Sequence, residues 1–116
     1  MSGPCSGLTI LDFSQGMPGA LCTLVMADYG AEVIKVEPPG GDPFRFQSAW
    51  ISWNRGKKGI ELDLNDSEAL EQAVKLIGEA DVLVESFRPG DMTQWQLDYE
   101  TISELYPRLV YCSITG

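Results

Sequence analysis

Apolar residues gather in five short runs along the chain, and polar turns rich in glycine and proline separate them. The runs lie at residues 8–13, 32–37, 60–64, 81–87 and 109–114. Each is rich in valine, isoleucine or leucine and is short enough to form a single strand. The pattern therefore predicts five short β-strands.

The segments between these runs have the spacing and the caps of helices. Apolar residues from Leu70 to Ile77 recur at i, i+3, i+4 and i+7, which predicts a helix with one face on a sheet. Polar residues at 65–67 and at Asp98 can cap helix starts. Helices are expected over 19–29, after 65–67, as one turn within 92–97 and from Asp98 up to Pro107. The stretch 44–59 has no clean period and is expected to be a long loop with a short helical turn.

Strands that alternate with helices predict the fold class. We expect an α/β, Rossmann-like, doubly wound and mainly parallel five-stranded sheet with flanking helices. The 116 residues suit one domain that spans 1–116. Ligands of such sheets bind beyond the carboxyl ends of the strands, near the switch point of the strand order. The loops that should form a site are therefore 15–19, 38–42, 65–67, 86–91 and 115–116.

Composition removes several classes of function. The chain carries 17 acidic and 8 basic residues, for a net charge of −9, which opposes binding to nucleic acid or to an anionic membrane. Histidine is absent, which excludes Ser-His-Asp and Cys-His catalysis and imidazole metal ligands, and no metal site is predicted. Three dispersed cysteines, no long apolar segment and no charged leader favour a cytoplasmic protein that is not exported.

Two strand-end loops carry groups that suit a nucleotide. Gly16 and Gly19 follow the first strand, where helix amides could meet an anion, although a tight turn with close helix packing is the simpler explanation. Phe87 and Arg88 place an aromatic face beside a cation, and a plain turn with a solvated arginine explains them equally well. Glu37 ends the second strand, where a ribose-binding acid is expected. Nothing in the spacing of the carboxylates selects a catalytic residue, and none is predicted.

A basic turn precedes the third strand. Arg55, Lys57 and Lys58 lie within four positions of an otherwise acidic chain, and their concentration predicts contact with an anion. A turn that precedes its strand belongs at the amino edge of a parallel sheet, away from the expected ligand. Contact with the ligand would therefore require the long loop from Phe44 to carry this turn back to the carboxyl edge.

Several ordered motifs complete the sequence evidence. They read LDFS at 11–14, ADYGAEVIKVEPPGGDP at 27–43, NRGKKGIELDL at 54–64, DVLVESFRPG at 81–90 and PRLVYCSITG at 107–116. Over about residues 8–116 the chain resembles the class III coenzyme A transferases, which include formyl-CoA transferase, carnitine CoA-transferase and α-methylacyl-CoA racemase.

The resemblance implies a Rossmann-like core that binds coenzyme A (CoA) or acyl-CoA, in interlocked homodimers that transfer CoA between carboxylic acids or racemise acyl-CoA. The family's catalytic residues lie beyond the equivalent of Gly116, so the chain is expected to be the N-terminal portion of a longer enzyme, or a stand-alone remnant, without turnover alone. By position, the resemblance implies CoA contacts from Gly16, Met17, Pro18, Pro38, Asn54, Arg55, Gly56, Lys57, Lys58, Ser86, Phe87 and Arg88.

Three positions depart from the family pattern. Pro38 and Gln94 stand where members carry basic residues, which lowers the expected affinity for CoA, and Gly56 replaces an asparagine. Two alternative functions are open. The apolar 44–53 loop would dock onto a partner chain in an interaction module. A nucleotide-binding half-domain of the NAD type is weakened by Ser14, which stands where its fingerprint requires glycine.

Overall fold

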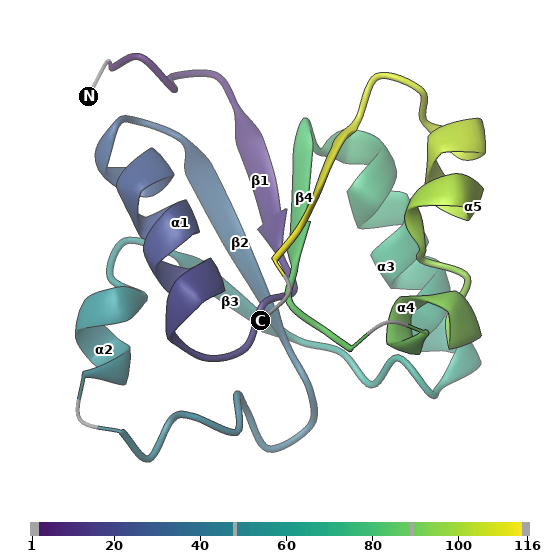
Figure 1. Cartoon of the computed structure of the whole chain (residues 1–116), viewed down its shortest axis with the longest axis horizontal. Helices are drawn as coiled ribbons and strands as arrows, with labels where there is room; N and C mark the ends of the chain where they lie inside the picture. Colours follow the sequence, from purple (N-terminus) through teal and green to yellow (C-terminus); the bar gives the residue numbers. More distant parts are fainter. Residues whose placement is uncertain (1–2, 48, 89, 115–116) are drawn as a thin grey trace.

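A five-stranded sheet stands between two groups of helices in the computed structural model, which describes residues 3–47, 49–88 and 90–114 (Figure 1). The strands are β1 (Thr9–Asp12), β2 (Glu32–Glu37), β3 (Lys58–Glu61), β4 (Val82–Glu85) and β5 (Val110–Ser113). The helices are α1 (Met17–Asp28), α2 (Trp50–Trp53), α3 (Ser67–Glu79), α4 (Asp91–Gln94) and α5 (Tyr99–Leu105).

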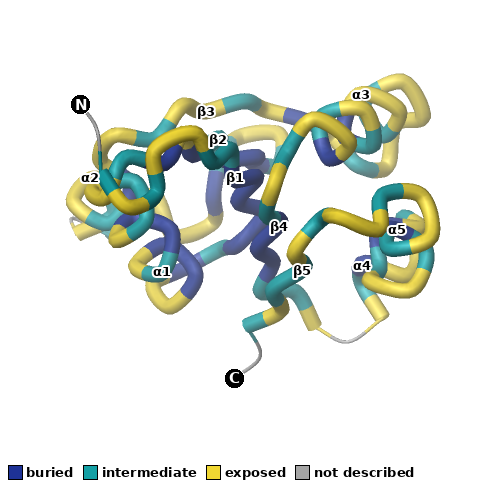
Figure 2. The backbone as a smooth tube through the Cα atoms, turned by 90° about the horizontal axis from the view of Figure 1, so that it is seen from above, coloured by how far each residue is buried: buried dark blue, intermediate teal, exposed yellow. Residues whose placement is uncertain are grey.

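The strands follow the order β3-β2-β1-β4-β5, and every pair of neighbours is parallel. Figure 2 shows α1 and α2 on one side of the sheet and α3, α4 and α5 on the other. The predicted Rossmann-like, doubly wound fold is therefore confirmed. Because the chain runs outward from β1 to β2 and later returns beside β1 as β4, the switch point lies between the carboxyl ends of β1 and β4.

Local sequence signals account for the helix starts. The Asp66 carboxylate accepts a hydrogen bond from the Ala69 amide at 3.1 Å and caps α3, and Asp98 accepts one from the Thr101 amide at 3.3 Å and caps α5. The start of α1 is different, because Gly16 precedes it with φ of 83° and no side chain caps it. Proline in its first turn needs no hydrogen-bond partner there.

The third strand differs from its expected position. The alternation predicted 60–64, whereas β3 covers Lys58–Glu61 because Ile34 to Glu37 of β2 pair with Lys58 to Glu61. The Leu62 amide still donates to the carbonyl of Glu37 at 2.9 Å, and the chain then turns. Pairing with the neighbouring strand, rather than side-chain alternation, sets where β3 begins and ends.

The core occupies both faces of the sheet. On one face, the buried Leu11 and Leu83 pack with Ala73 and Ile77 of α3. On the other, Ile10 packs in a second cluster that the amino end of the chain and α1 complete. Burial of these apolar side chains supplies the main driving force for folding.

Helix α1 is apolar on both of its faces. Its inner side buries Ala20 and Leu24, while Met17, Leu21 and Val25 on its outer side are 38–53% exposed. An apolar outer face is unusual for a helix that faces water. None of the helices in the described part of the chain combines the length and the apolar character that a membrane crossing needs.

Candidate functional site

The carboxyl edge of the sheet holds a small cavity of about 120 Å³, here called the strand-end cavity. Its lining comes from the ends of β1, β2, β3 and β4 and from the segment after α4. The lining residues are Phe13, Gln15, Val36, Glu37, Pro38, Pro39, Leu62, Asp63, Leu64, Asn65, Phe87 and Trp95. Four of the loops expected to form a site thus converge on one cavity.

An aromatic pair forms one wall of the strand-end cavity. The Phe87 and Trp95 rings meet edge to face, with centroids 5.3 Å apart. The Trp95 indole Nε1 donates to Asn65 Oδ1 at 3.0 Å, and the Phe87 amide donates to Glu85 Oε1 at 2.8 Å. Both rings are therefore held in place before any ligand arrives.

A serine ties the two loops of the switch point together. The Gln15 amide donates to Ser86 Oγ at 2.9 Å, and that hydroxyl donates to the Gln15 carbonyl at 3.2 Å. The loop after β1 is thereby fixed against the loop after β4. Exposed Met17 and Pro18 follow at the start of α1, so Gly16, Met17, Pro18 and Ser86 share the switch point.

The basic turn lies elsewhere. Arg55 pairs with Asp28, the last residue of α1, at 3.0 Å, and Lys58 pairs with Glu32, the first residue of β2, at 3.0 Å. Both pairs lie at the amino edge of the sheet, and the long loop does not carry the turn back. Asn54, Arg55, Gly56 and Lys58 are therefore not brought to the strand-end cavity.

Lys57 turns inward, and its side chain is only 2% exposed. Its Nζ donates to Asp12 Oδ2 at 3.2 Å, to the Ala20 carbonyl at 3.0 Å and to Asn54 Oδ1 at 2.9 Å. Burial lowers the pKa of Lys57, and the neighbouring Asp12 carboxylate opposes that shift. The anion that Lys57 meets in this structure is therefore an internal carboxylate, and all three ammonium protons are used.

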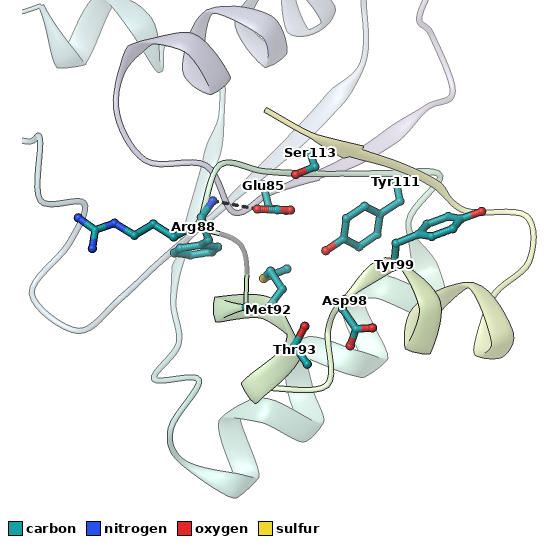
Figure 3. A pocket seen from close by; sticks show the side chains of 10 residues that line it. Glu85, Arg88, Met92, Thr93, Asp98, Tyr99, Tyr111 and Ser113 are labelled. Carbon is teal, nitrogen blue, oxygen red and sulfur yellow. Dashed lines mark hydrogen bonds between the residues drawn. The ribbon is translucent and has the colours of Figure 1, made fainter. Parts of the chain in front are cut away.

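A wider, shallower cavity of about 610 Å³ lies beside β4 and β5, against α4 and α5. We call it the tyrosine cavity, because Tyr99 and Tyr111 meet edge to face in its lining with centroids 5.8 Å apart. Figure 3 shows the Arg88 side chain pointing away from Glu85 and Tyr111. The Tyr111 hydroxyl donates to the Leu97 carbonyl at 2.9 Å.

Replacing Tyr111 with phenylalanine tests this half-buried phenol. Burial, and then Glu85 and Asp98, raise the pKa of Tyr111 above its ordinary 10.0. The Tyr111 hydroxyl therefore holds its proton more tightly in the folded chain than in the unfolded chain. The protonated hydroxyl contributes its full stabilisation of the fold below pH 10, and this contribution is lost as pH rises above 10. Tyr111→Phe removes the hydrogen bond and should lower the free energy of unfolding by about 1 kcal/mol near pH 7. Above about pH 10, the free energy of unfolding of Tyr111→Phe should fall less steeply with pH than that of the unmutated chain.

Urea titrations at a series of pH values would measure both effects. The lowered pKa of Lys57 acts in the opposite direction. It makes the free energy of unfolding increase as pH rises toward 10.5, the ordinary pKa of lysine. That contribution is common to both chains and cancels in their difference. Parallel stability curves above pH 10 would contradict the role assigned to Tyr111.

Reasoning from the sequence missed several residues of the strand-end cavity. Leu62 and Trp95 line it, and neither belongs to a loop singled out as a candidate site. Leu62 comes directly after β3, which ends at Glu61. A prediction that ended this strand at Glu61 would have placed Leu62 in a strand-end loop. Trp95 comes from a segment after α4, and the tertiary packing of that segment has no local sequence signal.

Other sequence predictions concern metal and partner binding. In residues 3–47, 49–88 and 90–114, no group of three or more Cys, Asp or Glu side chains is arranged to hold a metal ion. In the 44–53 loop, Phe46 is 80% exposed and Ile51 is 76% exposed. Docking of this loop onto a partner chain stays a prediction.

Comparisons with known proteins agree with the sequence motifs. The succinyl-CoA:mesaconate CoA-transferase of Haloarcula hispanica is 40% identical over 98% of this chain and 32% of its own length. A crystal structure of the hypothetical protein Rv3272 from Mycobacterium tuberculosis superposes with a TM-score of 0.95 at 38% identity, over 99% of this chain and 34% of that one. A CAIB/BAIF family protein from Brucella suis gives a TM-score of 0.93 at 35% identity, over 100% of this chain and 34% of that one.

The 116 residues thus span about a third of the length of the relatives that they match. The sequence model described as CoA-transferase family III matches residues 5–116. This match covers nearly all of the chain, and the fold as a whole superposes closely on the solved structures. The chain belongs to CoA-transferase family III.

Proposed function

We propose that this chain is the CoA-binding part of an enzyme that transfers CoA between carboxylic acids, and that it binds CoA or acyl-CoA at the carboxyl edge of its sheet. The relative from Haloarcula hispanica is named as a transferase of this kind. One observation supports this position of the CoA site: four strand-end loops converge on a cavity with a prearranged aromatic wall. Racemisation of an acyl-CoA is the alternative reaction within the same proposal.

The strand-end cavity suits the adenine ring of CoA. Apolar side chains such as Leu62 and Val36 line it, and Phe87 and Trp95 offer π-faces and edges to a flat base. Glu37, Asp63 and Asn65 add hydrogen-bonding groups at its rim. Pro38, which the resemblance implied as a contact, is part of the same lining.

The diphosphate of CoA would lie at the switch point. Arg88 is exposed and follows Phe87 directly. The first amides of α1, at Met17 and Gly19, have no side-chain cap, and Pro18 between them has no N–H. Uncapped amides at a helix start and an arginine both favour a phosphate. Ser86 holds the two loops together, and Gly16 provides the turn from β1 into α1.

This proposal leaves the basic turn out of the site. Arg55 and Lys58 pair with carboxylates at the amino edge, and the Lys57 ammonium is bonded inside the fold to Asp12 and Asn54. Asn54, Arg55, Gly56, Lys57 and Lys58 are therefore not proposed as CoA contacts. A cytoplasmic setting is part of the proposal, since Cys5, Cys22 and Cys112 are all free thiols, as expected in a reducing compartment.

Calorimetric titration of the 116-residue chain with CoA would test the site. Arg88→Ala should weaken CoA binding by about tenfold or more, since a charge-assisted hydrogen bond to phosphate is lost. Arg108→Ala is the matched control, because Arg108 is exposed and precedes β5 at the amino edge. The proposal fails if the folded chain does not bind millimolar CoA, and the site assignment fails if both variants weaken binding equally.

A further inference from the structure

Glu37 occupies the position at which many nucleotide-binding sheets of this type hold a ribose. It ends β2 and lines the strand-end cavity, where an acidic side chain would accept hydrogen bonds from ribose hydroxyls. In this chain both carboxylate oxygens are taken. Oε1 accepts from Arg45 Nε at 3.1 Å and from the Asp42 amide at 3.2 Å, and Oε2 accepts from Arg45 Nη2 at 2.6 Å. Three of the roughly four acceptor sites of this carboxylate are used, so Glu37 cannot accept from both hydroxyls of a ribose diol without releasing a present partner.

Arg45 is held rigidly beside that carboxylate. Its two hydrogen bonds to Glu37 form the bidentate fork that fixes a guanidinium plane, and its Cζ lies 4.1 Å from the centroid of the Trp50 ring. The backbone of Gly41 approaches it closely, because a Cβ at Gly41 would lie 2.6 Å from Arg45 Nε. These contacts hold the side chain in one position before a ligand binds.

The guanidinium nevertheless keeps donors for a ligand. Two of its five N–H groups donate to Glu37, and the other three have no hydrogen-bond partner within the described residues. The side chain is 49% exposed. Of the other nearby carboxylates, Asp42 pairs with Lys35 at 3.3 Å. Glu61, at the end of β3, accepts from the Gly40 amide at 2.6 Å and keeps its negative charge near Arg45. Arg45 lines a separate cavity of about 160 Å³, which adjoins the strand-end cavity at Glu37. Its free donors are therefore one side chain away from the strand-end cavity.

We propose that Arg45, fixed by Glu37 and Trp50, is a specificity-determining residue that binds a phosphate carried on the ribose of the bound nucleotide. The inference rests on the proposed function and adds to it the chemical class that the site selects. CoA carries a phosphate on its ribose 3′ oxygen, whereas dephospho-CoA, ADP and NAD have a free hydroxyl there. An arginine near this strand end favours the phosphorylated ribose, while a free acid would favour the diol.

Titration of the chain with CoA and with 3′-dephospho-CoA tests this selectivity. The unmutated chain should bind CoA about tenfold or more tightly than dephospho-CoA, and Arg45→Gln should reduce that ratio to about one or two, chiefly by weakening CoA. Arg45→Lys keeps the charge without the fork and should retain only part of the ratio. Arg108→Gln, at the amino edge, should leave the ratio unchanged.

Each outcome separates the inference from the proposed function. Equal affinity of the unmutated chain for CoA and dephospho-CoA overturns the role of Arg45 and leaves the CoA site in place. No binding of either ligand to the folded chain overturns both. If Arg45→Gln does not fold, Arg45→Lys supplies the comparison, and a folded Arg45→Lys with undiminished selectivity overturns the inference.

Discussion

Asp12→Ala is expected to lower the free energy of unfolding by about 3–5 kcal/mol, because it leaves a buried ammonium without its counter-charge. Asp12 ends β1 and has no exposed surface. Its carboxylate accepts from Lys57 Nζ at 3.2 Å, from Thr23 Oγ1 at 2.6 Å and from both the amide and the hydroxyl of Ser14. Urea denaturation with linear extrapolation would measure the loss.

The matched control is an exposed ion pair at the amino edge. Lys58 pairs with Glu32 at 3.0 Å, but the two side chains are 72% and 50% exposed. Lys58→Ala should therefore cost no more than about 1 kcal/mol. Asp12→Leu combined with Lys57→Met removes both buried charges and should recover much of the loss. If Asp12→Ala lowers the free energy of unfolding as little as Lys58→Ala does, the stabilising role assigned to the buried Asp12–Lys57 pair is wrong.

The same buried pair gives the basic turn an internal partner that the sequence did not suggest. A cluster of Arg55, Lys57 and Lys58 in an acidic chain looks like a site for an external anion. The partner of Lys57 is Asp12, 45 residues earlier, and no local pattern links the two. The rule that places ligands beyond the carboxyl ends of parallel strands puts this turn at the other edge. Arg55 and Lys58 do pair there, with Asp28 and Glu32, whereas the Lys57 side chain reaches Asp12 at the end of β1.

The fold itself could be predicted because its signals are local. The apolar run at 32–37 coincides with β2, and the polar residues Asp66 and Asp98 cap α3 and α5 as expected. Once a parallel doubly wound sheet is inferred, the convergence of the strand-end loops follows from topology. Contacts such as Arg45 on Glu37 or Trp95 beside Phe87 depend instead on how irregular segments pack, so they required the structure.

Gly19→Ala is expected to destabilise the chain by about 2–3 kcal/mol, because the start of α1 has no room for a methyl group. A Cβ at Gly19 would overlap the Cβ and Oγ of Ser14. Ser14 has no exposed surface and is bonded to Asp12, so it cannot move aside without disturbing the buried carboxylate. Alanine also restricts the unfolded chain, which offsets about 0.4–1 kcal/mol of the steric cost.

Gly59→Ala separates these two effects. Gly59 is exposed in β3, and no atom outside its chain neighbours lies within 4 Å of the position that a Cβ would take. Contacts of an alanine there should change the free energy of unfolding by no more than about 0.5 kcal/mol in either direction. The restriction of the unfolded chain by alanine adds the same gain as at Gly19. Thermal and urea unfolding of both variants would give the difference. A small cost at Gly19, similar to that at Gly59, would mean that Ser14 can shift and that the switch-point loop is less rigid than its contacts to Asp12 and Ser86 imply. A large cost at Gly19 alone would link the stability of this loop to the close approach of α1, which also holds the uncapped amides proposed to meet the diphosphate.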